Sequence, residues 1–463
     1  MDESFATVLE TVADARADSV AVTHGARTVT WRELDDRAAR LATHLSSVGI
    51  GHESRVGIAL YNSPEYFEAM WSILKLRAVP VNVNYRYKPE EMAYIFDDAG
   101  IGALVFDGSL AERVAAAAGV ARTRPALVQK GGDALVDGAV AFEAALESPP
   151  MPRIDRGDDY WLMYTGGTTG MPRGVLSRHS WLFPVAARNG FVNLGMAIPE
   201  DLDELRVALD QLASEGRSMA CLPGPPLMHG AGMYTALGSL IAGGRVACLT
   251  SRTLDADEML RTIQDQRVDT LSIVGDVFAV PLAEALERAA AAGRPYELSS
   301  LQRILSYGVT WSAESKQRLL AHGDFVCLDL VAASEGGPFA VAETRRGDDV
   351  TTSRFRLLPG SRIVTDEGLD VEPGSGQIGA LAALSDAHIR YLGDDTKTAE
   401  TFRVIGGERY VVPGDLASID EDGWVTFHGR GSQVINTGGE KVFAEEVENV
   451  VRRHPSVEDA MVV

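Results

Sequence analysis

The chain has 463 residues, of which 46 % are apolar and 23 % are charged, so it is long enough for two or three globular domains. Its 43 basic and 65 acidic residues give a net charge of −22, which argues against nucleic acid or an anionic membrane surface as a general partner. The acidic N-terminus and the lack of an apolar run of about 18 residues predict a cytoplasmic protein without a transmembrane segment.

Helix and strand signals alternate along the first 150 residues. Leucine and alanine at helical spacing predict a helix over 31–45, and a short apolar run predicts a strand over 55–60. The same signals predict helices over 64–76 and 90–98 and strands over 79–83 and 103–106. This order indicates a mostly parallel sheet with helices on both faces.

The alternation resumes in the middle of the chain and then gives way to shorter strands. We expect strands over 245–249, 270–274 and 302–306, and helices over 256–264 and 280–292. From about residue 360, Gly and Asp turns separate short strands, and a hairpin is expected around Glu421-Asp422-Gly423. The sequence therefore predicts a large α/β domain over 1–430 with parallel-rich sheets flanked by helices, and a small β-barrel-like subdomain over about 360–430.

The last thirty residues predict a strand over 433–436, a helix over 443–453 and a strand over 457–463. Such a short segment cannot bury an independent core. We interpret 433–463 as the start of a C-terminal domain that is incomplete in this sequence. The three cysteines, Cys221, Cys248 and Cys327, lack CxxC spacing, so we expect buried thiols.

A Gly/Thr-rich loop from Tyr164 to Gly174 carries the strongest chemical signal. Glycines let backbone N–H groups wrap an anion, threonines add hydroxyl donors, and Arg173 adds a positive charge. The spacing is not that of a Walker A loop. A flexible surface loop is the alternative, but an apolar strand directly before the loop argues against it.

The loop resembles the phosphate-binding signature of the adenylate-forming superfamily, which includes acyl-CoA synthetases, luciferases and adenylation domains. Arg173 stands where that signature usually has Lys, which keeps the charge but changes its geometry. The resemblance implies that the loop binds the phosphates of ATP through residues Thr165, Gly166, Gly167, Thr168, Thr169, Gly170 and Arg173.

Two later segments resemble the adenine-binding motifs of the same superfamily. Ser306 to Thr310 resembles the segment that passes one face of adenine, with Gly308 and Val309 at its centre. In the second segment the resemblance implies that Asp329 accepts from the adenine amino group, Ser334 contacts the α-phosphate and Glu335 holds Mg²⁺. The residues between them are Leu330, Val331, Ala332 and Ala333, and Val331 replaces an aromatic residue that often stacks on adenine. Outside this pattern, Glu335 would be an ordinary surface acid.

Asp415 and Arg430 resemble the two residues that contact the ribose and the phosphates. A turn residue and a surface cation are the alternatives, which the order of the motifs disfavours. The resemblance implies that Thr168, Thr169, Glu335 and Arg430 are the catalytic residues.

Pro226 to Gly232 resembles the segment that lines the acyl pocket, with His229 at its mouth. Carboxylates are ionised at pH 7, so His229 is expected to gate the pocket or orient the acid rather than act as a general base. A satisfied core or surface histidine is the alternative. The expected acyl and CoA pocket comprises His229, Gly230, Met233, Val274, Gly275, Gly308, Gly438 and Gly439.

The resemblance spans the chain from Thr30 onwards and is closest to bacterial fatty-acid and steroid-side-chain CoA ligases. It implies a cytoplasmic enzyme that uses ATP, Mg²⁺ and coenzyme A, and a homodimer is compatible with it. It also implies a hinge at 431–432, where Ser432 replaces the usual Asp or Lys. Relatives carry a catalytic Lys near the end of the C-terminal domain. Lys441 lies in an earlier loop and is not that residue. Because this sequence contains no such Lys, we expect it to adenylate poorly.

Two other functions remain open from the sequence. The acyl group could be loaded onto a carrier-protein thiol instead of CoA. Alternatively, the chain could be a non-catalytic nucleotide- or acyl-binding module, which Arg173 and Val331 favour and the retained Glu335, Asp415 and Arg430 oppose.

Overall fold

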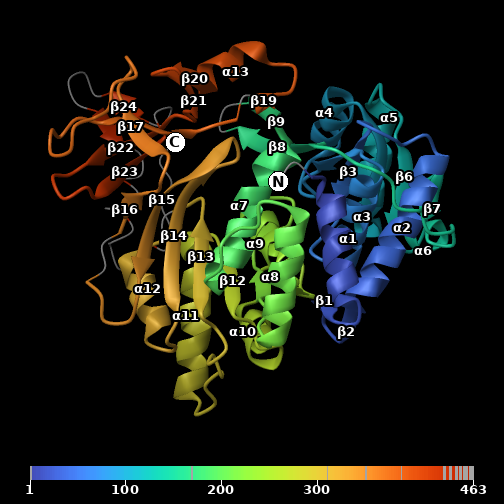
Figure 1. Cartoon of the computed structure of the whole chain (residues 1–463), viewed down its shortest axis with the longest axis horizontal. Helices are drawn as coiled ribbons and strands as arrows, with labels where there is room; N and C mark the ends of the chain where they lie inside the picture. Colours follow the sequence, from blue (N-terminus) through green and yellow to red (C-terminus); the bar gives the residue numbers. More distant parts are fainter. Residues whose placement is uncertain are drawn as a thin grey trace.

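The computed structural model describes residues 3–167, 170–309, 311–349, 352–386, 388–430, 434–436 and 441–443, together with residues 447, 451 and 457. Two large sheets and the helices around them form most of the molecule (Figure 1). None of the helices in the described part of the chain is long and apolar enough to cross a membrane.

The first sheet has eight strands in the order β19-β9-β8-β4-β3-β5-β6-β7. Its strands from β8 to β7 run parallel, whereas β9 is antiparallel to both β8 and β19. The strands are β3 (Arg55–Ala59), β4 (Val79–Asn82), β5 (Ile101–Asp107), β6 (Ala126–Lys130), β7 (Ala139–Ala141), β8 (Tyr160–Gly167), β9 (Gly170–Arg178) and β19 (Arg390–Tyr391).

The second sheet begins with a parallel part in the order β1-β11-β10-β12-β13-β14. Antiparallel strands flank it, β2 beside β1 and β15 beside β14. The strands are β1 (Val20–His24), β2 (Arg27–Thr30), β10 (Ala220–Pro223), β11 (Arg245–Cys248), β12 (Thr270–Ile273), β13 (Arg303–Tyr307), β14 (Val326–Ala333) and β15 (Gly336–Thr344).

The β-rich part continues this second sheet and does not close into the predicted barrel. Within the described residues, β16 bonds to β15 on one side and to β23 on the other, so the path runs open from β2 to β20. The strands do not close into a barrel because β15 already occupies one edge of β16, so that edge cannot accept another strand. Its strands are β16 (Arg354–Leu357), β17 (Ser361–Val364), β18 (Gly379–Leu384), β20 (Phe402–Ile405), β21 (Glu408–Val411), β22 (Asp415–Ile419) and β23 (Val425–Arg430).

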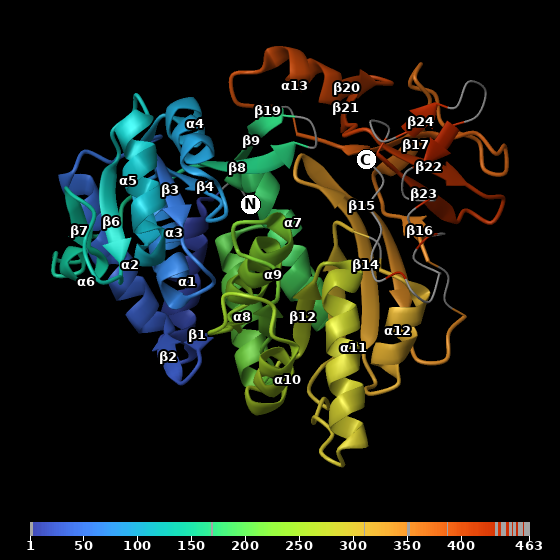
Figure 2. The ribbon, with the colours of Figure 1, turned by 180° about the vertical axis from the view of Figure 1, so that it is seen from behind.

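Helices form three layers around the two sheets (Figures 1 and 2). A shared core places six helices between the sheets: α1 (Phe5–Arg16), α2 (Trp31–Ser47), α3 (Pro64–Lys75), α7 (His179–Phe191), α8 (Leu202–Ser214) and α9 (Gly230–Ile241). The outer face of the first sheet is covered by α4 (Pro89–Ala99) and α5 (Ala111–Val120). The outer face of the second sheet is covered by α10 (Ala256–Asp265), α11 (Gly275–Ala291) and α12 (Ala313–Leu320).

The predicted α/β alternation is confirmed with small shifts of boundary. A capping box between Thr30 and Glu33 starts α2 at the predicted residue. The helix expected over 280–292 instead begins at Gly275 and contains Pro281. The hairpin expected around Glu421-Asp422-Gly423 is formed by β22 and β23. The three cysteines are buried and free, as predicted, and burial raises the pKa of each thiol.

Two short strands lie beyond Arg430. β24 (Val434–Asn436) and β25 (Lys441–Phe443) pair as an antiparallel two-stranded sheet. The predicted helix over 443–453 and strand over 457–463 lie almost wholly outside the described residues.

Candidate active site

The predicted phosphate loop is the tip of an antiparallel hairpin formed by β8 and β9. Its register pairs Tyr164 with Gly174 and Thr165 with Arg173. A Cβ atom at Gly174 would lie 2.8 Å from Cδ1 of Leu162, so a larger residue here would require the Leu162 side chain to move. Thr168 and Thr169 lie outside the described residues, as do Gly438, Gly439 and the proposed hinge at 431–432.

Asn82, at the end of β4, holds the base of this hairpin. Its Oδ1 accepts from the Tyr164 backbone N–H at 2.6 Å, and its Nδ2 donates to the Tyr164 carbonyl at 2.9 Å. The same Nδ2 donates to the carbonyl of Met228 at 2.8 Å. Asn82 therefore joins the phosphate hairpin to the residue that precedes His229, a role that the sequence analysis missed.

A short segment after β18 joins the other edge of the hairpin. Tyr391 in β19 pairs with Val175, and the Leu392 N–H donates to the Gly174 carbonyl at 2.8 Å. Beyond it, Asp394 Oδ2 lies 3.4 Å from the Nε of Arg173, whose side chain is 51 % exposed. The predicted phosphate cation thus already has an internal anionic partner, and the pair remains open to solvent.

Glu335 lies in the turn between β14 and β15 and faces the same segment. The Tyr391 hydroxyl donates to Glu335 Oε1 at 2.6 Å. Tyr391 is buried, and both burial and the neighbouring carboxylate raise the pKa of its hydroxyl. The hydroxyl therefore stays protonated and donates to the Glu335 carboxylate.

The two predicted adenine segments lie side by side because β13 and β14 are parallel neighbours. Their register pairs Ser306 with Asp329 and Tyr307 with Leu330. Thr310 lies outside the described residues. The predicted residues of these segments that face a common cavity are Gly308, Val309, Leu330, Ala332, Ala333, Ser334 and Glu335.

Asp329 and Val331 point to the other side of β14. The Asp329 Oδ2 accepts from Lys316 Nζ at 2.9 Å, and both side chains are buried. Burial raises the pKa of Asp329, and the Lys316 charge opposes that shift. Val331 packs against the core of the antiparallel strands. Asp329 therefore has a protein partner that was not predicted, and its bond to adenine stays a prediction.

The predicted ribose residues are neighbours in the structure. Asp415 is the first residue of β22, Arg430 is the last of β23, and the two are paired in register. Gly414, with φ of +98°, makes the turn that leads into Asp415. Val411, the last residue of β21, lies beneath Gly336, which places the end of β21 close to the Glu335 turn.

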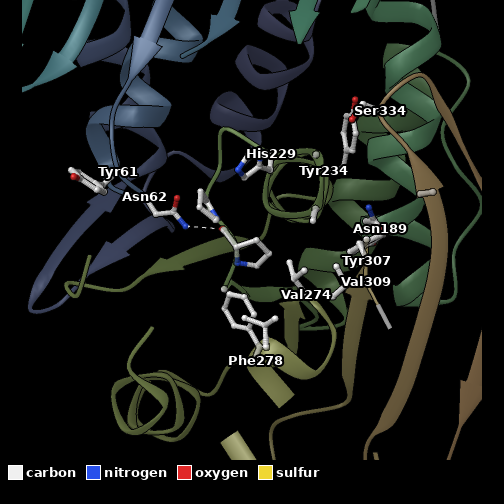
Figure 3. A pocket seen from close by; sticks show the side chains of 18 of the residues that line it. Tyr61, Asn62, Asn189, His229, Tyr234, Val274, Phe278, Tyr307, Val309 and Ser334 are labelled. Atoms are coloured by element: carbon white, nitrogen blue, oxygen red, sulfur yellow. Dashed lines mark hydrogen bonds between the residues drawn. The ribbon is translucent and has the colours of Figure 1, made fainter. Parts of the chain in front are cut away.

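A cavity of about 720 Å³ opens beside Glu335 and extends between α7, α9 and the ends of β12, β13 and β14 (Figure 3). Its acyl-sized part is lined by Trp181, Leu182, Val185, Asn189, Gly230, Tyr234, Val274, Phe278, Tyr307 and Val309. Burial raises the pKa of Tyr234 to about 12 and that of Tyr307 to about 12, so both hydroxyls are neutral donors. The wall is mostly apolar, with a few hydroxyl and amide groups.

His229 is the N-cap residue of α9 and lines this cavity. Burial lowers the pKa of the imidazole, and the positive charge of Arg86 lowers it further. His229 is therefore neutral at pH 7, which suits an orienting or gating role better than that of a fixed cation.

Two of the predicted pocket residues do not line the cavity. Met233 is 2 % exposed and lies in the core between the sheets, because it occupies the inner face of α9. Gly275 begins α11 behind Val274, and its N–H donates to Ser306 Oγ at 3.0 Å. Periodicity cannot tell which side of α9 or which end of α11 faces the cavity, so a role for these two residues stays a prediction.

A second part of the cavity, which the sequence analysis missed, is polar. Arg86, Lys130 and Arg252 line it together with Asp107 and Tyr61. Arg252 donates to Asp107 Oδ1 at 3.0 Å and lies 4.4 Å from the Tyr61 ring centroid. Arg86 and Arg252 come from two separate loops and Lys130 from the end of β6, so no local motif predicts them.

The described residues contain no cluster of three or more side chains that could hold a metal ion. Mg²⁺ in nucleotide enzymes commonly uses one or two carboxylates and completes its shell with phosphate oxygens and water. Only one oxygen of the Glu335 carboxylate bonds to Tyr391. The second oxygen is suited to bind a Mg²⁺ ion that is also bound by the phosphates of the substrate.

Solved structures of similar fold include CoA ligases. The anthranilate CoA ligase AuaEII, in complex with anthranoyl-AMP, matches with a TM-score of 0.82 at 21 % identity over 100 % of this chain and 84 % of that chain. The O-succinylbenzoate coenzyme A synthetase of Bacillus subtilis, in complex with AMP, matches with a TM-score of 0.76 at 21 % identity. The match covers 98 % of this chain and 85 % of that chain. At this identity the likeness concerns the fold, and the predicted α/β architecture is confirmed.

Relatives of known function cover nearly the whole chain. The 3-oxocholest-4-en-26-oate–CoA ligase of Rhodococcus rhodochrous is 36 % identical over 99 % of this chain and 83 % of its own length. A medium/long-chain-fatty-acid–CoA/3-oxocholest-4-en-26-oate–CoA ligase of Mycobacterium tuberculosis is 37 % identical over 99 % of this chain and 84 % of its own length. The model of the AMP-binding enzyme family matches residues 9–383. This chain belongs to the family of AMP-binding enzymes.

Proposed function

We propose that this protein is an AMP-forming acid–thiol ligase that activates a carboxylic acid with ATP and passes the acyl group to coenzyme A. One observation carries the proposal. Glu335 lines the acyl-sized cavity and is joined through Tyr391 and β19 to the Gly-rich hairpin. A phosphate site and an acyl site therefore share one wall.

In the first half-reaction, a carboxylate oxygen of the acid forms a bond to the α-phosphorus of ATP, and the bond to the bridging oxygen of pyrophosphate breaks. No proton is transferred, so the site needs positioning groups and positive charge rather than a general base. Arg173 and the hairpin N–H groups would bind the departing phosphates. Mg²⁺ bound at Glu335 would supply further neutralisation of phosphate charge. Neutral His229, at the cavity mouth, would orient the carboxylate.

In the second half-reaction, a thiol sulfur forms a bond to the acyl carbon, AMP leaves, and the thiol proton is released to solvent. Coenzyme A is a polyanion, and Arg86, Lys130 and Arg252 line the second part of the cavity. Arg86, which is exposed and has no ion-pair partner among the described residues, is the cation best placed to bind a phosphate. This polar part favours coenzyme A over a carrier protein as the thiol donor.

The acyl group is proposed to be a fatty acid or a steroid-side-chain carboxylate. The cavity of about 720 Å³ includes the polar part and the end beside Glu335, and its apolar wall leaves room for a bulky apolar group. Its wall combines apolar side chains such as Val274 and Phe278 with the hydroxyls of Tyr234 and Tyr307. The names of the two relatives describe acids of these two kinds.

Five further proposals rest on the sequence alone. Residues 1–430 would form the catalytic body, with a β-rich part over about 360–430. Residues 431–432 would be the hinge, and 433–463 would begin a mobile C-terminal domain. The protein would be cytoplasmic and a homodimer, which light scattering on the purified chain would test.

The experiment is a panel assay with the full chain, ATP, Mg²⁺ and coenzyme A. The acids are octanoate, palmitate, 3-oxocholest-4-en-26-oate and benzoate, and mass spectrometry detects acyl-AMP and acyl-CoA. We expect both products, formed slowly because this sequence is expected to adenylate poorly, with at least one of the first three acids and little with benzoate. Transfer to a carrier-protein thiol but not to coenzyme A would favour the carrier-loading alternative. No product with any acid, together with tight AMP binding, would favour the binding module.

A further inference from the structure

The segment from Tyr391 to Asp394 touches both charged groups of the proposed phosphate site. At one end, the Tyr391 hydroxyl donates to Glu335 at 2.6 Å. At the other end, Asp394 pairs with Arg173 at 3.4 Å. Between them, the Leu392 N–H donates to the Gly174 carbonyl at 2.8 Å. No residue of this segment carries a role in the predicted motifs.

Tyr391 is held rigidly enough to fix its partner. Its backbone pairs with Val175 of the hairpin, and its N–H donates to Thr398 Oγ1 at 3.0 Å. The ring is 5 % exposed and its centroid lies 6.2 Å from that of Phe402. A buried ring with a fixed backbone loses little further freedom when its hydroxyl binds a carboxylate.

Glu335 has no comparable support of its own. It lies in a turn beside the exposed Ser334, and Tyr391 is its one hydrogen-bond partner among the side chains that the structure describes. A hydrogen bond from a hydroxyl to an ionised carboxylate is short and strong. The bond to Oε1 therefore selects one rotamer of Glu335 and directs Oε2 elsewhere.

We propose that Tyr391 is a positioning residue that holds Glu335 in register with the Gly-rich hairpin, so that the free carboxylate oxygen meets a divalent cation on the phosphates of ATP. The proposal rests on the proposed function, because it assumes that the hairpin and Glu335 bind Mg²⁺·ATP. It adds a residue outside the loop, adenine and ribose motifs. Because Tyr391 is part of β19, any shift of the hairpin moves the Glu335 support with it.

The test is the variant Tyr391→Phe, which removes the hydroxyl and keeps the ring. Binding of Mn²⁺ in the presence of ATP, without acid, is measured by electron paramagnetic resonance, and the Mg²⁺ dependence of ATP–pyrophosphate exchange is measured in parallel. We expect Mn²⁺ to bind roughly 10-fold to 100-fold more weakly in the presence of ATP, as for loss of a hydrogen bond to a charged group. The KM for the acid should stay unchanged.

Two control variants separate positioning from folding. Tyr410→Phe removes a hydroxyl that also bonds a glutamate, Glu408 Oε2 at 3.2 Å, in the same β-rich part. Phe402→Leu disturbs the packing of the Tyr391 ring and keeps its hydroxyl. Both controls should bind Mn²⁺·ATP like the wild type, and Tyr391→Phe should add no further loss to Glu335→Gln.

The outcomes distinguish the two proposals. If the wild type binds Mn²⁺·ATP and exchanges pyrophosphate while a folded Tyr391→Phe matches it, the positioning role is overturned and the proposed function stands. If Phe402→Leu reproduces the loss, ring packing rather than the hydroxyl is responsible, and the positioning role is again overturned. If the wild type neither binds Mn²⁺·ATP nor exchanges with any acid, both proposals are overturned.

Discussion

The phosphate side and the acyl side of the site are built in opposite ways. On the phosphate side, Arg173 and Glu335 are charged, and each is bound to one short segment after β18. On the acyl side, Tyr234, Tyr307 and His229 are neutral at pH 7 and come from different elements.

The difference follows from what each ligand demands. Phosphates need several N–H groups on one anion, which a contiguous glycine-rich hairpin supplies. A bulky apolar group needs only a dry wall of the right volume, which side chains from any element can form. Substitutions on the two sides should therefore change different constants, nucleotide and metal binding on one side and choice of acid on the other.

The largest effect is expected for Glu335→Gln. Removing the carboxylate charge that is proposed to hold Mg²⁺ should lower the kcat of ATP–pyrophosphate exchange by about 100-fold to 1000-fold. Glu343→Gln is the matched control, because Glu343 is an exposed β15 residue paired with Arg345 at 2.7 Å. Equal rates for both variants would remove Glu335 from the catalytic site.

We expect Asn82→Ala to remove the hydrogen bonds that join the Gly-rich hairpin to the segment before His229. This change leaves the Tyr164 N–H and the carbonyls of Tyr164 and Met228 without their partner in a buried place. Each such group costs about 1–3 kcal/mol, so the melting temperature should fall by roughly 5–10 °C. Asn193→Ala, which loses one bond to Asn189, is the control. Similar melting temperatures would mean that Asn82 does not join the hairpin to the acyl side.

We expect His179, in the helix layer between the two sheets, to limit the stability of the protein at acid pH. Burial lowers its pKa to about 4, and its Nδ1 accepts from the Phe5 N–H at 3.3 Å. The unfolded chain therefore binds a proton below about pH 6.5 that the folded chain does not bind until about pH 4, so stability falls across that window.

The loss should reach about 3 kcal/mol at the acid end of that window. His179→Gln cannot take up this proton, so its melting temperature should fall less between pH 7 and pH 5, as followed by calorimetry. Parallel curves for variant and wild type would assign the acid sensitivity to other groups.

The acyl side should respond selectively to Val274→Trp. The larger ring fills part of the cavity, so the KM of palmitate or 3-oxocholest-4-en-26-oate should rise by roughly tenfold or more. The KM for ATP should stay unchanged. Val207→Trp is the control, because Val207 is 67 % exposed on α8. A rise in the KM for ATP instead would contradict the separation of the two sides.

The smallest effect is expected for Asp394→Asn. Asparagine can still accept from the Lys397 N–H at the start of α13 (Asp395–Thr401), so this change removes only the charge that pairs with Arg173. An exposed ion pair is worth at most about 1 kcal/mol, so the KM for ATP should fall by less than about fivefold. A rise in that KM would show that Asp394 supports rather than restrains Arg173.

What the sequence could predict follows the same division. The Tyr164–Gly174 loop could be predicted as a phosphate site because the residues proposed for that role lie in one continuous stretch. The βα alternation was found because helix and strand periods are local. Asn82 was missed because its partner lies 82 residues later, although a polar residue at the end of an apolar strand is a signal that could have found it.

Residues that contact a predicted site residue were also not predicted from the sequence, because these contacts form only in the folded structure. Lys316 is 13 residues before Asp329 but reaches it from a different layer, and Tyr391 is 56 residues after Glu335. Of the two apolar residues predicted for the acyl pocket, Val274 lines the cavity and Met233 lies in the core, a difference that only the packing of the folded chain decides.

One measurement tests most directly whether the two sides form a single site. An acyl-sulfamoyl-adenosine carries both the acyl and the nucleotide group, and calorimetry compares its Kd for the full chain with those of AMP and of the free acid. We predict binding at least about 1000-fold tighter than that of AMP, because the second group binds without a new loss of translational freedom. Affinity no greater than that of AMP would show that the hairpin and the cavity do not meet in one site.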